Sequence, residues 1–348
     1  MTDLAFVSTR PSLRIDGDER AALGEALSTM TVNQPLNGMA HAELTLTNWG
    51  QSEQGREPDF LFGDVALGSR LEILLGEESP ATLFDGEITG IEERYGDGAP
   101  QLILLAQDRL HRLARQRHSR SFEDRSPDEL VQEIAAEAGI SADANVSSLR
   151  ANWHQLNESN LAFLLRLLRP FDICLRLHQE TLRARSEEPD PQPVALDAQD
   201  SALSVRLLAD LNHQPTRARV LGFNPGDDAV VNGSAQSLQP APTGTTAAAT
   251  LGELGWDGEE IMPQPFPRSQ AEAEAFARGQ LQSRAKRFLS GDIRCQGEPQ
   301  LRSGREIELS GVSERLRGIY QVVHCVHRFD GRTGYETHLR VERPDWTP

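Results

Sequence analysis

The 348-residue sequence contains little lysine and cysteine, few aromatic residues and no long apolar run. Its only lysine, Lys286, lies in a basic run and does not follow a glycine-rich turn, so the phosphate-binding loop of nucleotide hydrolases is excluded. The three cysteines, Cys174, Cys295 and Cys325, are widely spaced and odd in number. That pattern favours buried free thiols in a reducing compartment over a disulfide framework.

No stretch approaches the roughly eighteen apolar residues that a membrane helix needs, and the N-terminus lacks the basic segment and apolar run of a signal peptide. We therefore expect assembly in the cytoplasm without membrane insertion. Asp and Glu total 52 against 35 Lys and Arg, a net charge of −17. This acidic balance disfavours nucleic acid and anionic lipid as partners, so no specific nucleic-acid binding is expected.

Residues that could carry chemistry are few, and no zinc-protease, nucleophile-elbow or dinucleotide-binding motif occurs. His324 and His327 are the best metal candidates by proximity, but residues three apart in a strand point to opposite faces. Cys325 alternates in phase with Val323 and Phe329, which predicts a buried thiol and not a nucleophile. We predict no catalytic, cofactor-binding or metal-binding residue, and no enzyme.

Strand patterns dominate the first third of the chain, where apolar and polar residues alternate with a period of two. Asp97-Gly98 predicts a tight turn between the last two candidate strands. We predict a first β-barrel domain over residues 1–120. Its candidate strands cover residues 42–47, 71–75, 83–95 and 101–106.

Two helical patterns and a hairpin follow. The first helix begins with Ser126 and Glu129 in capping-box positions, and the second covers residues 159–169. Residues 171–185 have the pattern of a short hairpin. Together they predict a small α/β domain over residues 121–195.

Strand patterns return in the last part of the chain, over residues 203–234 and residues 292–341. Between them, residues 236–268 are rich in Ala, Thr, Gly and Pro, which predicts a low-complexity loop outside the core. A helix is expected over residues 269–289, and the second β-barrel domain over residues 196–348.

One supersecondary order occurs twice. Residues 71–109 and 305–343 each contain a strand, a glycine-ended turn, a long strand, an Asp-Gly hairpin and a return strand, which indicates duplication. The repeat matches Gly86 with Gly318 and marks both, together with Asp330 and Gly331, as structural positions. The predicted fold is mainly β with an α+β insert: two similar β-barrels plus a small α/β domain.

The segment QLNESNLAFLLRLLRPFDICLRLHQETLRAR, residues 155–185, resembles the phage late control D family, which is similar to the N-terminal part of VgrG spike proteins. Residues 121–140 are similar to the helix that precedes this segment in the family. Residues 303–344 match the family's ending, in which Tyr320 and Tyr335 occupy matching strand positions, so both tyrosines join the structural positions.

The resemblance implies a trimeric baseplate hub in a phage tail, a type VI secretion system or another contractile injection system. Each subunit would supply two tube-like barrels, so that three subunits match a hexameric inner tube on one side and a trimeric spike on the other. The implied partners are further copies of the chain, the spike, inner-tube or tube-initiator proteins and other baseplate proteins. The chain ends at Pro348 without the needle of VgrG. A separate spike protein is therefore expected, and the hub would end up in a virion tail or injection particle.

Two other classes of function stay open on these residues. A tail-associated peptidoglycan hydrolase needs a paired acid and base or a metal site. A glycan-binding or small-molecule-binding β-barrel protein needs an aromatic-lined pocket. Aromatic residues are 5% of the sequence and fall mostly on core-patterned positions, which favours the structural hub over both alternatives.

Overall fold

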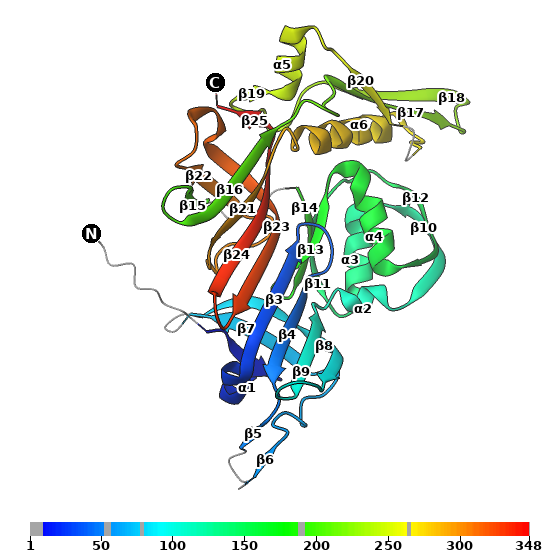
Figure 1. The fold of residues 1–348 in the computed structure, drawn as a ribbon. Helices are drawn as coiled ribbons and strands as arrows, with labels where there is room; N and C mark the ends of the chain where they lie inside the picture. The colour runs from blue at the N-terminus through cyan, green and yellow to red at the C-terminus, as the bar shows by residue number, and fades with distance from the viewer. Residues whose placement is uncertain (1–9, 52–56, 77–79, 187–191, 263–265, 348) are drawn as a thin grey trace.

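A computed structural model describes residues 10–51, 57–76, 80–186, 192–262 and 266–347. Residues 1–9, on which the expectation about a signal peptide partly rests, lie outside these ranges. Figure 1 shows a mainly β molecule, with two groups of long strands that meet near the centre and a cluster of helices to one side. Within the described ranges, every helix falls short of the length or the apolarity required to span a bilayer.

The first group of strands, called here the first half-sheet, is antiparallel and follows the predicted alternation. In the strand over residues 41–47, for example, Ala42, Leu44 and Leu46 are buried while their neighbours are not. The pairing order is β3-β4-β9-β8-β7-β1, with the short β2 (Asp18–Glu19) beyond β1 and helix α1 (Ala21–Ala26) between β2 and β3. The six strands are β1 (Ser12–Ile15), β3 (Leu27–Pro35), β4 (His41–Thr47), β7 (Arg70–Leu75), β8 (Ala81–Arg94) and β9 (Gln101–Gln107).

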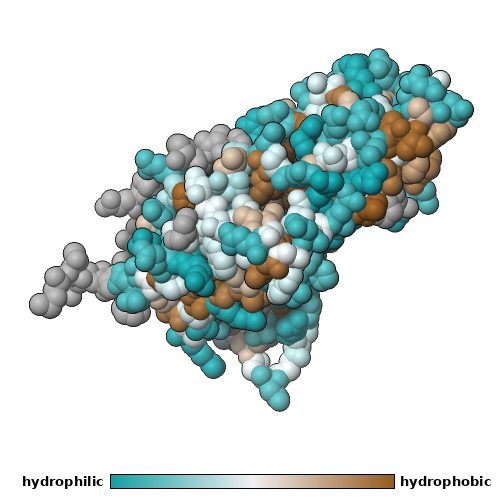
Figure 2. Space-filling view, turned by 90° about the horizontal axis from the view of Figure 1, so that it is seen from above, coloured by the Kyte–Doolittle hydropathy of each residue, from teal (hydrophilic) through white to brown (hydrophobic). Residues whose placement is uncertain are grey.

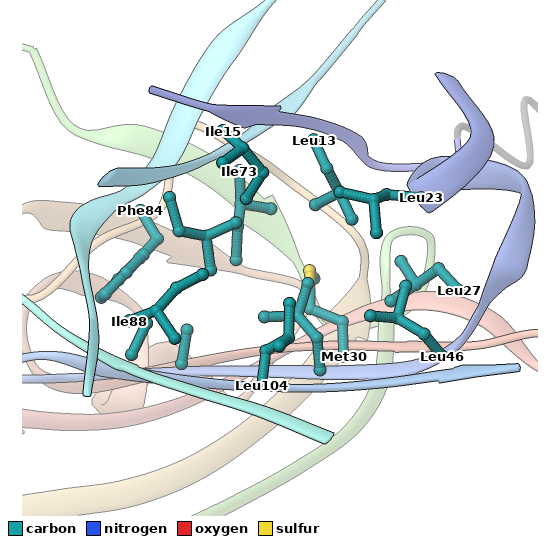
Figure 3. Packing of buried hydrophobic residues seen from close by; sticks show 14 of the residues in the cluster. Leu13, Ile15, Leu23, Leu27, Met30, Leu46, Ile73, Phe84, Ile88 and Leu104 are labelled. Carbon is teal, nitrogen blue, oxygen red and sulfur yellow. The ribbon is translucent and has the colours of Figure 1, made fainter. Parts of the chain in front are cut away.

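The core of the first half-sheet forms because the strands turn their apolar faces toward one another. Figure 3 shows Leu13 and Ile73 facing Met30 and Leu104 across this core. Phe329, from near the other end of the chain, belongs to the same cluster. Removing one such large apolar side chain typically costs about 2–5 kcal/mol of stability.

The predicted α/β domain has its own core beside the first half-sheet. Its first helix starts with the predicted capping box: the Glu129 amide donates to Ser126 Oγ at 3.2 Å, and the Ser126 amide donates to Glu129 Oε2 at 3.0 Å. Ser159 caps the second helix by accepting from the amide of Ala162. The elements are α2 (His111–Ala114), β10 (Arg117–Arg125), α3 (Pro127–Glu137), β11 (Ser141–Asn145), β12 (Ala151–Ser159), α4 (Asn160–Leu168), β13 (Cys174–His178) and β14 (Thr181–Arg185).

The second half-sheet repeats the plan of the first, with the pairing order β15-β22-β23-β24-β21-β16 and its own apolar cluster. The two half-sheets stand in the places of the two expected barrels. The β15–β22 pair is parallel, whereas the corresponding β1–β7 pair is antiparallel. The strands are β15 (Val194–Asp197), β16 (Ala202–Ala209), β21 (Leu289–Gln296), β22 (Glu306–Ser310), β23 (Gly318–Asp330) and β24 (Gly334–Arg343).

An arm is inserted between β16 and β21, and its helix and strand correct the expectation of a low-complexity loop over residues 236–268. Helix α5 forms there because Thr246 Oγ1 accepts from the Ala249 amide at 3.1 Å, while Ala247 and Leu251 are buried. Helix α6 covers one face of the small sheet formed by β17, β18 and β20. The elements are β17 (Arg217–Asn224), β18 (Ala229–Ala235), β19 (Thr245–Thr246), α5 (Ala247–Leu254), β20 (Glu259–Met262) and α6 (Gln270–Ala285).

Candidate assembly surface

Strand β23 joins the two half-sheets into one large sheet. Residues 324–330 of β23 pair with residues 29–35 of β3, while residues 318–321 pair with β22 on the same edge. At this joint Phe329 lies opposite Met30, is only 4% exposed, and packs in the first core. The joint is therefore a buried contact between the two halves.

The duplication extends to irregularities in the strand register. Between β3 and β4 the pairing shifts between Leu27 and Thr29, and between β16 and β21 it shifts between Ala202 and Ser204. In both strand pairs the shift occurs at the start of the first strand named, so β16 is the counterpart of β3.

The long strands carry a second matching shift. It lies between Ile88 and Gly90 in β8, and between Val322 and His324 in β23. Two residues before each shift stand Gly86 and Tyr320. Matching by register therefore aligns Gly86 with Tyr320, two residues away from the Gly86–Gly318 match that the sequence pattern suggests.

Gly86 and Gly318 both lie where a side chain has little room, for different reasons. A Cβ at Gly86 would collide with the backbone oxygen of Gln107. Gly318 has φ +134°, a conformation that favours glycine, and a Cβ there would collide with the Arg343 guanidinium. The structural role of both glycines stays a prediction.

The other four predicted structural residues surround the end of the joint and the second core. Tyr320 is fully buried and donates from Oη to the Leu316 carbonyl at 2.7 Å. Asp330 and Gly331 form the β23–β24 turn, where the Gly331 amide donates to the Ser28 carbonyl at 3.1 Å. Tyr335 packs against the first core from β24. Their structural roles also stay predictions.

The two histidines have different surroundings. His324 Nε2 lies 2.6 Å from Asn33 Oδ1, whereas the His327 ring is fully buried and lies beside Cys325 and Tyr335. That the two histidines do not share one ion stays a prediction. Across the described ranges, no group of three His, Cys, Asp or Glu side chains could hold a metal ion.

Sequence reasoning missed the contact between Cys325 and His327. It compared Cys325 with the adjacent histidines and not with the residue two positions along, which lies on the same face of a strand. Burial raises the pKa of the Cys325 thiol and lowers the pKa of His327 to about 4. Both groups are therefore neutral near pH 7, and the pair does not form the thiolate that a cysteine nucleophile needs.

A cavity of about 620 Å³ lies where the half-sheets meet the α/β domain. Its carboxylates are engaged: Asp85 accepts two hydrogen bonds from Arg70 at 2.8 and 2.7 Å, and buried Asp108 accepts from the amides of Ala40 and Leu110. Burial raises the pKa of Asp108 to about 7. These hydrogen bonds indicate a structural role for Asp85 and Asp108.

Exposed apolar side chains gather at two places. Tyr95 directly follows β8, and its ring centroid lies 6.1 Å from that of Phe60, which in turn contacts Trp49. Figure 2 shows hydrophobic surface toward the end of the arm, where Phe223 and Val230 form an exposed cross-strand pair. Surfaces of this kind suit contact with other proteins.

Residues 9–330 match a protein family described as the Alg8 N-terminal domain. Among curated protein sequences, none matches the chain significantly.

Several solved structures share the fold. The 43 kDa tail protein of prophage MuSo2 from Shewanella oneidensis is 12% identical, with TM-score 0.72 over 97% of this chain and 99% of the other. A tail protein from Neisseria meningitidis MC58 is 13% identical, with TM-score 0.67 over 98% and 99%. The E. coli c3393 protein, a type VI secretion component, is 12% identical, with TM-score 0.62 over 95% and 76%. The fold of this chain is thus one that phage tail and type VI secretion proteins use.

Proposed function

We propose that this chain, which belongs to the Alg8 N-terminal domain family, is a structural baseplate hub of a phage tail or contractile injection particle. The observation that carries the proposal is the duplicated half-sheet, with matching register shifts, joined by β23 and β3 into one sheet. The fold shared with tail and secretion proteins supports it. Within that group, the chain would act as the late control D and VgrG-like hubs do.

The mechanism is a change of symmetry. Three copies of a chain with two similar half-sheets present six similar units, which suit a hexameric inner tube. The same three copies present three equivalent positions for a trimeric spike made of separate chains. Because cyclic assemblies repeat one interface, a single type of contact between copies is enough to close the ring.

We propose units at residues 1–120, 121–195 and 196–348. The separate apolar clusters support a division into three, although Phe329 packs in the first cluster and Leu110 and Leu113 pack in the second. The first and third would form the ring, while the α/β unit and the arm would face other baseplate proteins. The chain would assemble in the cytoplasm and end in the finished tail.

The hub is proposed to have no enzymatic activity. The engaged carboxylates of the central cavity and the neutral Cys325–His327 pair support a structural role.

Native mass spectrometry of the full chain, co-expressed with the spike and tube proteins of its own particle, tests the proposal. Three hub chains bound to three spike chains is the expected result. A one-to-one complex or a hub hexamer would remove the symmetry-matching mechanism. Electron microscopy of the same complex would report whether the six half-sheets form one ring.

A further inference from the structure

Several strand edges have no partner strand within the described ranges, among them the outer edges of the short strands β2 and β15, and two of these edges belong to the longer strands β16 and β8. β16 is the last strand of the large sheet and pairs on one side only, with β21. β8 pairs with β7 over residues 81–87, and bonds from Gly68 and to Ser69 extend this cover to Ile88. Beyond Ile88 only the β9 side of β8 is paired.

The counterparts of these two edges are paired with each other inside the chain. The register shifts make β16 the counterpart of β3. They also make residues 90–96, which are the end of β8 and the two residues that follow it, the counterpart of residues 324–330. In the chain, β3 and residues 324–330 form the joint. The molecule therefore contains one complete joint and, on opposite halves, the two separated edges of a second.

We propose that β16 of one copy pairs antiparallel with residues 90–96 of a second copy, in the register that β3 and β23 adopt within the chain. The proposal deepens the proposed function by naming the partner and the contact that close the ring, and its trimeric number rests on that function. Transferring the register places Val205 opposite Tyr95, as Met30 lies opposite Phe329.

Tyr95 and Val205 are more exposed than their counterparts in the joint, as expected if their partner strand is missing in the single chain. Phe329 is 4% exposed in the first core, whereas its counterpart Tyr95 is 63% exposed. Val205, the counterpart of Met30, packs on the second core but is only half-buried, whereas Met30 is 1% exposed. Pairing of the two copies would place the Tyr95 ring over Val205 and repeat the burial seen at the first joint.

The β16 edge has few of the features that block strand pairing, and its one charged side chain is Arg206. Edge strands are commonly protected by proline, lysine or inward-pointing charges. The sequence of β16, ALSVRLLA, contains neither proline nor lysine, and Leu203 and Leu208 are about half exposed. An unprotected edge with exposed leucines is expected where another strand adds to the sheet.

The contact is head-to-tail, because each copy offers β16 to one neighbour and the end of β8 to the other. Such heterologous contacts close into rings when the rotation allows it. Joints within and between copies would then alternate around the ring and present six half-sheets in equivalent positions from three copies.

A disulfide between the paired positions tests the register. Residues directly opposite in antiparallel strands have Cβ atoms about 4.5–5.5 Å apart, within reach of a disulfide after small adjustment. The full-length chain with Val205→Cys and Tyr95→Cys is oxidised over a concentration series and run on non-reducing gels. The matched control carries Arg206→Cys with Tyr95→Cys, since residue 206 points to the opposite face. Both chains keep the three native cysteines, so cross-links through those appear equally in the two.

The expected result is covalent dimers and trimers, reversible by reductant, from the first double variant and at most a tenth as much from the control. A trimer by native mass spectrometry without this cross-link would overturn the edge pairing and leave the hub proposal standing. Cross-linked rings of another number would keep the pairing and overturn the trimeric hub. If the protein stays monomeric and forms no cross-link at any concentration, both the edge pairing and the trimeric hub are overturned.

A second measurement needs no cysteine. Tyr95→Asp places a charge in the proposed contact, whereas Trp256→Asp does so at an equally exposed aromatic residue, 63% in each case, in the arm. Light scattering should report at least tenfold weaker self-association for Tyr95→Asp than for Trp256→Asp. Equal effects of the two substitutions would count against the proposed contact.

Discussion

Cys325 Sγ lies 3.4 Å from His327 Nε2, with both side chains closed to solvent. On the other side of the ring, Tyr335 Oη lies 2.7 Å from Nδ1. This cluster binds β23 to β24 where β23 also pairs with β3, so its protonation affects the joint between the half-sheets. The first prediction follows from it.

Acid should weaken the fold through His327. Burial holds its pKa at about 4 in the folded protein, against 6.5 as the ordinary value. Between these pH values the unfolded chain binds a proton that the folded chain does not, so the free energy of unfolding falls as pH falls, by about 3 kcal/mol at pH 4. Urea unfolding at several pH values, compared with His327→Gln, isolates the effect. The difference in unfolding free energy between the parent and His327→Gln should shrink on acidification. A difference that stays constant with pH would contradict the prediction.

Counterpart aromatic residues should differ in their contribution to the stability of the free chain. Phe329→Ala empties part of the first core and should cost about 3–5 kcal/mol. Tyr95→Ala removes an exposed ring and should change stability by no more than about 0.5 kcal/mol. Denaturant unfolding of dilute, monomeric protein measures both. Similar losses for the two variants would contradict the exposure of Tyr95 in the free chain.

Gly318→Val should destabilise the protein by about 1–3 kcal/mol, because φ is +134° and the new side chain meets Arg343. Arg343 is itself buried and donates to the carboxylate of Asp345 at 2.8 Å, so it has little freedom to move. Gly252→Ala, in α5 with open space around it, is the control and should be neutral or stabilise slightly. Thermal unfolding distinguishes them, and a Gly318→Val variant that melts with the parent would show that the conformation is not required.

Purified protein should give no lytic band on peptidoglycan zymograms. Asp108 is the carboxyl group with the best-placed pKa for an acid, about 7, but it is buried and holds two backbone amides. Asp108→Asn serves as the diagnostic variant. A band from the parent that disappears in Asp108→Asn would establish a hydrolase and overturn the structural reading.

The sequence predicted those elements whose signals are local. Ser126 and Glu129 identify the start of α3 because a capping box needs only residues three apart. The alternation at Ala42, Leu44 and Leu46 identifies β4 for the same reason.

The sequence did not predict elements whose composition is misleading or whose formation depends on contacts between distant residues. Helix α5 lies in a segment that looks low in complexity, yet Thr246 caps it and Ala247 packs in the second core. The β3–β23 joint links residues about three hundred positions apart. The local sequence around Met30 or Phe329 does not indicate which strand will pair with it. The contact between Cys325 and His327 could have been found from the two-residue period.

Phe329 has a consequence for the order of synthesis. The first half of the chain leaves the ribosome long before Phe329 is made, yet its core lacks that ring until β23 arrives. A nascent N-terminal portion therefore waits, partly packed and with the edge of β3 bare, for the last strands. Contacts between such distant residues slow folding. A prematurely terminated chain would lack the joint, so completion of the first core depends on translation through β23.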